Sequence, residues 1–297
     1  MESSPSSSSP RAVGERSPRK WTVIASIAVL LVLLAGSAFA FKVAREAPSA
    51  DRDWAADQAV APRISFQGDR VRIENLRDFR HGSDGAFVPG YRDETYDLAD
   101  VRGVSFVLAP FAERWRGLAH GFVSFELAGD RFVSISVEAR REEDEEYSLL
   151  GGLMRRFEVS YVVGTEEDLI GLRAVRGDTL FVYPSRATPE QASTLFADML
   201  RGAQSVHTQP VFYNTLFRNC MTILRDHVNR LEGVSLPYGW GMLLPGYSDE
   251  LALENGLLDT DLPIEEARIR FRVDETAREA LVRGERFSSR IRPPEGL

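Results

Sequence analysis

The chain has 297 residues, of which 43% are hydrophobic, and this composition is ample for a packed core of domain size. The formal net charge is −8, but the first 42 residues hold five basic and two acidic residues, which leaves 31 basic and 42 acidic residues beyond them. This acidic remainder argues against a nucleic-acid-binding protein, which needs a basic footprint. Lys20 and Lys42 are the only lysines, so the rest of the chain offers no lysine nucleophile.

The N-terminal segments predict a membrane anchor. Residues 1–20 are rich in serine and proline and are expected to form a disordered cytoplasmic tail. Residues 21–41 carry no charge and are long enough to span a bilayer as a helix. The basic residues before this segment keep the N-terminus in the cytoplasm by the positive-inside rule, and the remainder then lies in the periplasm at the inner membrane. The alternative is a cleaved signal peptide, because residues 38–40 (Ala-Phe-Ala) resemble a signal-peptidase site.

A charged linker is expected over residues 42–57, followed by one domain over residues 58–297. Strands are expected over residues 70–73, 103–108, 120–127, 131–139, 157–163 and 180–183. Helices are expected over residues 188–202, 219–231, 247–255 and 274–283. Since the strands come first and the helices later, the order predicts the α+β class.

Cys220 is the only cysteine, which excludes an intrachain disulfide. It follows Asn219, the expected N-cap, at the start of a helix, where unpaired backbone N–H groups and the helix dipole stabilise a thiolate. Cys220 is therefore a candidate nucleophile, and the alternative is a buried, inert thiol.

His120 is the best candidate for the base that a thiol nucleophile needs. His227 lies about two turns along the same helix, roughly 10 Å from Cys220 and beyond hydrogen-bond reach. His81 and His207 lie in polar, turn-like stretches and are expected at the surface. His120 instead opens a strand.

The hydrophobic pattern of the hairpin after His120 also predicts its register. Alternate residues of both strands are apolar, and placing both sets on the core side requires an odd-length loop. A three-residue loop at 128–130 pairs Leu127 with Arg131, sets Ser124 opposite Ser134, and sets His120 opposite Glu138. Glu138 is therefore a candidate to orient the imidazole. The alternative is an ordinary solvated charge.

Other kinds of catalytic site fit the sequence poorly. There is no Gly-x-Ser-x-Gly elbow for a serine hydrolase and no His-Glu-x-x-His for zinc. No phosphate-binding glycine loop is present, and the five consecutive acids at 142–146 are expected to form a solvated loop. We therefore expect neither a metal nor a cofactor.

Five segments together resemble the Lnb N-terminal periplasmic domain family, a family long filed as a domain of unknown function. They are Leu-Ala-His-Gly-Phe-Val-Ser-Phe at 118–125, Val-Ser-Ile-Ser-Val-Glu-Ala-Arg-Arg-Glu at 133–142, Glu-Tyr-Ser at 146–148, Phe-Tyr-Asn-Thr-Leu-Phe-Arg-Asn-Cys-Met-Thr at 212–222 and Leu-Pro-Gly-Tyr-Ser-Asp-Glu-Leu at 244–251. The resemblance runs from about Trp54 to Arg283. It departs from the common form at Met221, which separates Asn219 and Cys220 from Thr222.

The resemblance implies a thiol-dependent domain at the outer face of the bacterial inner membrane, with a permuted papain-like (NlpC-type) fold. It carries Cys220 over as nucleophile and His120 as base, and Glu138 as the third group. Candidate supporting or substrate-binding residues within the same segments are Asn219, Thr222, Ser124, Arg140 and Tyr213.

The resemblance suggests acyl transfer through a Cys220 thioester, with a lipid as acyl donor and a lipoprotein or peptide amine as acceptor. A papain-like amidase acting on peptidoglycan or peptides is the second hypothesis. A non-catalytic envelope-binding module is the third. A long apolar groove beside Cys220 would favour acyl transfer, a polar open cleft would favour peptidoglycan, and a thiol buried away from His120 would favour the binding module.

Overall fold

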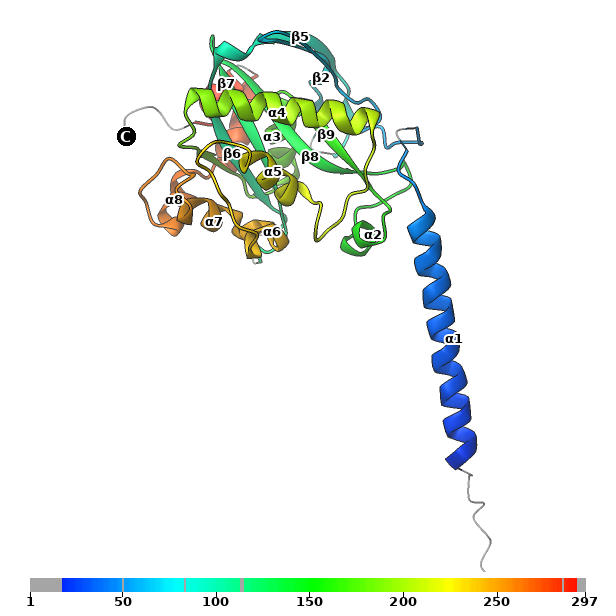
Figure 1. Cartoon of the computed structure of the whole chain (residues 1–297). Helices are drawn as coiled ribbons and strands as arrows, with labels where there is room; N and C mark the ends of the chain where they lie inside the picture. The colour runs from blue at the N-terminus through cyan, green and yellow to red at the C-terminus, as the bar shows by residue number, and fades with distance from the viewer. Residues whose placement is uncertain (1–17, 50, 83, 113–114, 285, 293–297) are drawn as a thin grey trace, which may run out of the picture. The chain divides into compact units, whose positions relative to one another are not determined.

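The computed structural model describes residues 18–49, 51–82, 84–112, 115–284 and 286–292, which belong to two compact units (Figure 1). The first unit ends at Ala47 and contains helix α1 (Pro18–Arg45). The stretch Trp21–Phe39 of this helix is long and apolar enough to cross a membrane. Residues 1–17 of the expected cytoplasmic tail lie outside the described residues.

The second unit begins at Pro48, earlier than the boundary expected at residue 58. Residues of the expected linker already pack with this unit. Trp54 forms an isolated antiparallel bridge with Glu142, and Ala55 is buried. Burying an indole and a methyl group lowers the free energy of the folded chain, so these residues pack against the second unit.

Within the described residues, an eight-stranded sheet forms the centre of the second unit, in the order β1-β2-β9-β8-β7-β6-β10 with β5 paired to β2. All neighbours are antiparallel except β2 and β9. The strands are β1 (Arg63–Gln67), β2 (Arg70–Arg77), β5 (Tyr91–Asp97), β6 (Val101–Pro110), β7 (Ala119–Leu127), β8 (Arg131–Arg140), β9 (Glu158–Gly164) and β10 (Phe181–Pro184). A separate two-stranded sheet joins β3 (Arg80–His81) to β4 (Phe87–Val88).

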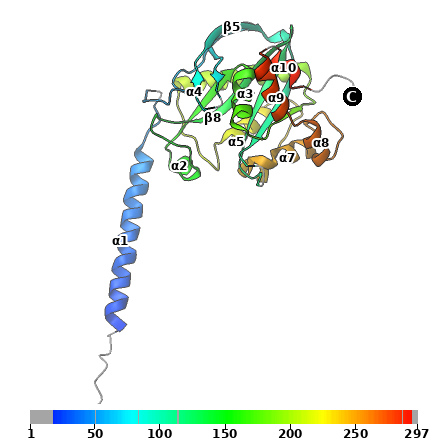
Figure 2. The ribbon, with the colours of Figure 1, turned by 180° about the vertical axis from the view of Figure 1, so that it is seen from behind.

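Helices cover both faces of the sheet. Figure 1 shows α4 (Pro189–Thr208) and α5 (Cys220–Val228) in front of it, and Figure 2 shows α3 (Glu166–Arg176), α9 (Asp274–Arg283) and α10 (Phe287–Arg290) on the opposite face. The remaining helices are α2 (Leu149–Leu153), α6 (Trp240–Leu243), α7 (Ser248–Glu254), α8 (Ile264–Arg270) and the 3-10 helices η1 (Leu98–Asp100) and η2 (Pro245–Tyr247).

Each face of the sheet carries its own hydrophobic cluster. The alternate residues Val123, Phe125 and Leu127 of β7 belong to the cluster beneath α4 and α5. Phe122, on the opposite face of β7, belongs to the cluster beneath α3 and α9. Since successive strand residues point to opposite faces, β7 contributes to both cores and passes between two helical layers.

The β7–β8 hairpin has the register that its hydrophobic pattern predicts. The ladder pairs Leu127 with Arg131 and Ser124 with Ser134 across a turn at 128–130. It ends at Val123 and Ile135, after which β7 continues along β6 and β8 continues along β9. The two strands therefore separate toward the end that carries His120 and Glu138.

The structure mixes helices and strands as expected, but helices already occur before the last strand. Helix α3 lies between β9 and β10, and its end signals are all in the sequence: Thr165 caps it by accepting from the N–H of Asp168, three acids occupy its first turn, and Gly177 ends it with a φ of 80°. The apolar periodicity of this short helix is interrupted. The helix was therefore not predicted between the strands on either side of it in the sequence. The domain is mixed α/β.

The expectation that His81 lies at the surface is also wrong. Its side chain is buried, and Nε2 lies 2.7 Å from Asp168 Oδ1. Asp168 is fully buried and also accepts from Arg77 Nε and Nη2 at 2.8 and 2.9 Å and from the backbone N–H of Phe79 at 2.9 Å. A buried carboxylate with this many donors holds α3 against β2 and β3.

Replacing Asp168 should strongly destabilise the domain. Asp168→Ala leaves the buried guanidinium of Arg77 without its bidentate partner, so we expect the free energy of unfolding to fall by about 3–5 kcal/mol. The matched control is Asp93→Ala, which removes an exposed partner of Arg72 at 3.0 Å and should cost about 1 kcal/mol or less. Guanidinium denaturation of the full chain in detergent, followed by circular dichroism, measures both. Equal losses in the two variants would contradict the assigned role of Asp168.

Candidate functional site

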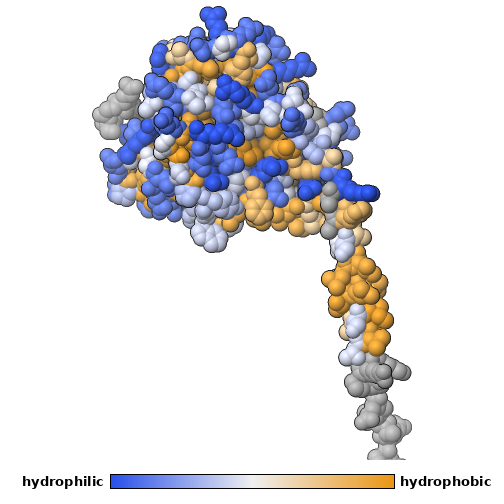
Figure 3. All heavy atoms as spheres, in the orientation of Figure 1, coloured by the Kyte–Doolittle hydropathy of each residue, from blue (hydrophilic) through white to orange (hydrophobic). Residues whose placement is uncertain are grey.

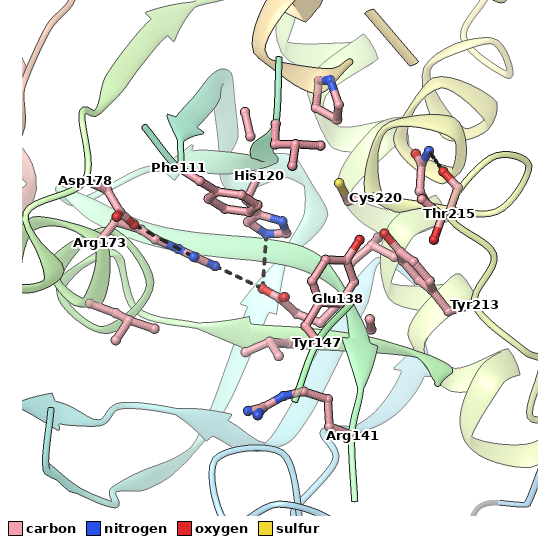
Figure 4. Close-up of a pocket in the computed structure, with 18 of the residues that line it drawn as sticks. Phe111, His120, Glu138, Arg141, Tyr147, Arg173, Asp178, Tyr213, Thr215 and Cys220 are labelled. Atoms are coloured by element: carbon pink, nitrogen blue, oxygen red, sulfur yellow. Dashed lines mark hydrogen bonds and ion pairs between the residues drawn. The ribbon is translucent and has the colours of Figure 1, made fainter. Parts of the chain in front are cut away.

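A cavity of about 370 Å³ opens where β7 and β8 separate, and its walls come from both helical layers. Cys220, His120 and Glu138 all line it (Figure 4). Apolar side chains on the Cys220 side include Leu118, Leu149, Leu243 and Pro245, whereas α3 contributes Arg173 and Arg176.

A capping box fixes the start of α5 and hence the position of Cys220. Asn219 Oδ1 accepts from the N–H of Thr222 at 2.9 Å, and Thr222 Oγ1 accepts from the N–H of Asn219 at 2.8 Å. The Asn219 amide also donates to the carbonyls of Thr215 and Met242 at 2.8 and 2.9 Å. Cys220 is therefore the first residue of a helix whose N-cap is fixed by hydrogen bonds with Thr222, Thr215 and Met242.

Gly121, directly after His120, allows α5 to lie close against β7. A Cβ atom at this position would lie 2.4 Å from Met221 Sδ, closer than non-bonded atoms approach. A side chain here would have to displace the Met221 thioether. The glycine thus leaves room for Met221 to pack between α5 and β7 beside His120.

His120 is tied to Glu138 directly and through Ser136. His120 Nε2 lies 2.6 Å from Ser136 Oγ and 3.0 Å from Glu138 Oε1, and Ser136 Oγ donates to the same carboxylate oxygen at 2.7 Å. Cys220 lines the same cavity, and its side chain helps to raise the pKa of the His120 ring. Figure 4 shows Cys220, the imidazole and Glu138 in sequence across the cavity. The predicted alternative of Glu138 as a solvated strand charge is therefore wrong.

The electrostatics of the cavity favour a charged imidazole. Burial lowers the pKa of His120, but the Glu138 carboxylate and the hydrogen bonds with Cys220 and Glu138 outweigh burial and raise this pKa to about 9. Burial likewise raises the pKa of Glu138, but the charge and hydrogen bond of His120, together with Arg173 and Ser136, hold it well below its usual range. At neutral pH the pair is an imidazolium and a carboxylate.

Arg173 extends this chain of charges to α3. Its Nη2 lies 3.7 Å from Glu138 Oε1, and its Nη1 lies 4.0 Å from Asp178 Oδ2. The guanidinium is mostly buried, so it is only weakly screened and holds the carboxylate in its ionised form. Arg176, one helical turn further along α3, lines the same cavity.

Two tyrosines lie on the Cys220 side of the cavity (Figure 4). The rings of Tyr147 and Tyr213 meet edge to face, with centroids 6.3 Å apart. Burial, followed by the proximity of Cys220 and Tyr147, raises the pKa of Tyr213 far above its ordinary value. Tyr213 is therefore a neutral hydroxyl at any physiological pH and remains available as a hydrogen-bond donor.

Three of the predicted supporting residues do not line the cavity. Ser124 Oγ donates to Glu166 Oε1 at 2.5 Å on the α3 side of the sheet. Arg140 stacks over Trp54 at 4.2 Å and donates to the carbonyls of Gln58 and Ala59. Thr222 is buried and acts only through the capping box. Asn219 and Tyr213, in contrast, line the cavity.

Sequence reasoning missed Ser136, Tyr147 and Arg173 as site residues. Ser136 could have been found, because two residues of a strand that are two apart point to the same face, and Ser136 precedes Glu138 at that spacing. Tyr147 lies within a segment that carries the family resemblance. Arg173 was missed because the helix that carries it was not predicted.

The acidic run at 142–146 is part of a loop with ion pairs. Glu142 pairs with Arg52 at 3.2 Å, and Glu145 pairs with Arg156 at 3.1 Å. Among the described residues, no group of three or more His, Cys, Asp or Glu side chains could hold a metal ion.

The fold and the site define a mixed α/β domain that holds a thiol, an imidazole and a carboxylate in one cavity. The chain belongs to the Lnb N-terminal periplasmic domain family, whose model matches residues 88–246 and thus includes all three groups. The resemblance inferred from the sequence is confirmed over this range, which is shorter than the stretch from Trp54 to Arg283. Membership makes this a periplasmic, envelope-related protein. No curated protein and no solved structure matches the chain.

The His120 ring should titrate well above an ordinary histidine. With only four histidines in the chain, isotope-labelled histidine gives few NMR resonances, and His120→Asn identifies the one required. We expect a midpoint near pH 9. Glu138→Gln should lower the pKa, because removing the carboxylate charge leaves burial, which favours the neutral ring.

The control for this titration is Glu143→Gln, which neutralises an exposed acid and should leave the His120 midpoint unchanged. A midpoint near 6.5 in the unmodified chain would show that Glu138 does not stabilise the imidazolium.

Proposed function

We propose that this chain is a membrane-anchored, periplasmic acyltransferase that carries the acyl group on Cys220, with His120 as acid and base and Glu138 as the orienting carboxylate. The observation that carries the proposal is that one cavity holds the Cys220 thiol, the His120 imidazole and the Glu138 carboxylate, with His120 Nε2 3.0 Å from Glu138 Oε1. An imidazolium beside a sulfur at a helix start is the environment that stabilises a thiolate. The proposed fold is permuted papain-like.

In the first half-reaction, the Cys220 sulfur attacks the carbonyl carbon of a lipid ester. A C–S bond forms, and the carbonyl oxygen becomes a tetrahedral oxyanion. When the oxyanion collapses, the ester C–O bond breaks, and the imidazolium of His120 gives its proton to the departing alkoxide. Since Nε2 faces Ser136 and Glu138, Nδ1 is the ring nitrogen left to serve the sulfur and the leaving group.

Backbone N–H groups at the start of α5 are suited to stabilise the oxyanion. The capping box accounts for the N–H of Thr222, whereas those of Cys220 and Met221 have no intrahelical acceptor at the first two helical positions. The neutral hydroxyl of Tyr213 is a further donor on the same side of the cavity.

In the second half-reaction, an amine replaces the thiol. The amine nitrogen attacks the thioester carbon, a C–N bond forms and the C–S bond breaks. His120, neutral after the first step, takes the proton from the amine, and Cys220 leaves as the thiolate. The resemblance suggests a lipoprotein α-amine as the acceptor, and the enzyme returns to its starting state.

The cavity walls support a donor that is both apolar and anionic. Leucine and proline side chains surround Cys220, whereas Arg173 and Arg176 form the α3 end. A phospholipid combines an acyl ester with a phosphate in this way, and guanidinium groups bind phosphate strongly.

Amide hydrolysis is the second candidate, because the cavity is not a long apolar groove. The same three residues would cleave an amide if water took the place of the acceptor amine, and the arginines of α3 would bind a peptide carboxylate. A purely binding role has less support, since the thiol shares a cavity with His120 rather than lying away from it.

Mass spectrometry of the full chain after incubation with phospholipid vesicles tests the proposal. Cys220 should gain an acyl mass that hydroxylamine removes, and the modified chain should lose it to an added peptide amine. Cys220→Ser and His120→Ala should each lower turnover by about a thousandfold or more, and the double variant should lose little more, because the residues act as a unit.

The control is Cys220→Ser purified in parallel, whose thermal unfolding should match the parent. Full turnover in a Cys220→Ala protein would refute the nucleophile. Cleavage of a peptide amide without a stable acyl adduct would replace the acyltransferase proposal with the amidase.

The proposed orientation has the N-terminus in the cytoplasm, with Trp21–Phe39 retained as a span. A reporter that is active only in the periplasm, joined after Ala47, should be active and remain in the membrane fraction. A reporter active only in the cytoplasm should be silent at the same junction. The reverse result would contradict the orientation, and a soluble periplasmic fusion would instead indicate signal cleavage.

A further inference from the structure

We infer that the mouth of the Cys220 cavity docks on the lipid bilayer through an exposed apolar rim, which presents the cavity to lipid held in the membrane. The role of the docked lipid rests on the proposed function, whereas the docking itself does not. The apolar rim consists of Phe111, Leu150, Leu153, Phe217, Tyr238 and Trp240.

The rim side chains are large, apolar and well exposed to solvent. They are 42% to 76% exposed, and Phe217 and Trp240 are at the upper end of this range. Single exposed apolar side chains are normal on soluble proteins, but a continuous patch indicates an interaction surface. Figure 3 shows an apolar edge over α2 that continues as a weakly polar surface over α6.

Hydrogen bonds join the segments of the rim into one surface around the cavity mouth. Tyr238 donates to the carbonyl of Leu216 at 2.7 Å, and Thr215 donates to the carbonyl of Leu149 at 2.8 Å. The loop after β6 is held to η2, since Arg116 Nη2 donates to the carbonyl of Gly246 at 2.8 Å.

Gly246 makes this last contact possible. A Cβ atom at this position would lie 1.3 Å from the carbonyl oxygen of Arg116, so only glycine allows the two loops to approach. The rim also borders the reacting groups, because Phe111 lines the cavity together with Cys220, as do Leu149 and Leu243, which share α2 and α6 with rim residues.

The charge of the rim segments suits a phospholipid surface. Residues 147–157, 212–219 and 237–247, three of the four rim segments, contain no acidic residue, although the chain carries 44 acids in all and the segment after Phe111 contains Glu113. The three segments contain Arg155 and Arg218, together with Arg156, which pairs with Glu145. Arginines beside exposed aromatic rings match an interface where phosphates lie next to acyl chains, and Trp and Tyr favour that depth.

The short tether between the apolar helix and the domain favours a membrane over a soluble partner. The apolar stretch of α1 ends at Phe39, and the compact domain begins at Pro48. Nine residues reach at most about 30 Å even when fully extended. A domain tethered this closely meets the bilayer surface at a high effective concentration, so a modest apolar contact is sufficient to dock it.

Spin labelling of the full chain in lipid nanodiscs tests the docking. Because Cys220 is the only cysteine, Cys220→Ser gives a thiol-free background for Phe217→Cys and Trp240→Cys. Val282→Cys on α9, a side chain that is 89% exposed, is the matched control. A nitroxide on the rim should be relaxed strongly by oxygen and weakly by a water-soluble nickel chelate, and the control should show the opposite. Rim labels as accessible to nickel as the control would overturn the proposal.

A second measurement separates docking from chemistry. Phe217→Ser with Trp240→Ser should lower acylation of Cys220 by vesicle lipid about tenfold or more, because apolar contact with the bilayer is lost. Alkylation of Cys220 by iodoacetamide should stay within about twofold of the parent. The control pair is Val88→Ser with Val282→Ser, two exposed valines outside the rim, which should acylate like the parent.

The two proposals fail in different ways. If the unmodified chain never acylates Cys220 but the rim labels lie in lipid, the acyltransferase proposal fails and the docking stands. If acylation by vesicle lipid is unchanged in the rim variant and the labels face water, the docking fails and the chemistry stands.

Discussion

The close approach of α5 to β7 is the constraint on which the site depends. The Met221 side chain packs directly on β7, with Sδ 2.4 Å from where a Cβ atom of residue 121 would lie, and Gly121 leaves it this space. The separation of β7 from β8 past Val123 and Ile135 then opens the cavity at the point where the helix begins. Close packing and a local gap in the sheet together put a thiol beside a histidine.

Burial gives the charges in this cavity their effect. Arg173, Glu138 and His120 alternate in sign from α3 toward Cys220, and each is largely withdrawn from water. Isolated charges in such a place would lose their hydration without compensation, so each depends on its neighbour to remain ionised. The same arrangement raises the pKa of His120 to about 9. The ion pairs of Glu138 with Arg173 and His120 therefore connect α3, on one face of the sheet, with the cavity beside α5 on the other.

Much of the fold and site followed from local patterns. Thr188 and Asn219 were recognised as helix caps, because capping depends on a side chain and the backbone two or three residues away. The register of the β7–β8 hairpin followed from alternation as far as Val123 and Ile135, and the side chains of His120 and Glu138 still meet where the strands separate. The helix α3 was missed although Thr165 and Gly177 mark its ends, so Arg173 was not found. His81 was misplaced because its polar neighbours concealed a buried partner, Asp168.

The sequence by itself determined the apolar N-terminal segment, the acidic domain, the family, and the identities of the thiol, imidazole and carboxylate. These depend on composition, short-range periodicity and motifs, which one chain contains without reference to its fold. The tertiary structure alone decided that Ser124 and Arg140 lie outside the cavity and that Tyr147 and Arg173 lie inside it. It also brought Phe111, Leu149, Thr215 and Leu243, from four separate segments, to the lining of one cavity. Contacts between segments far apart in the chain are set by how layers pack, and no local pattern encodes them.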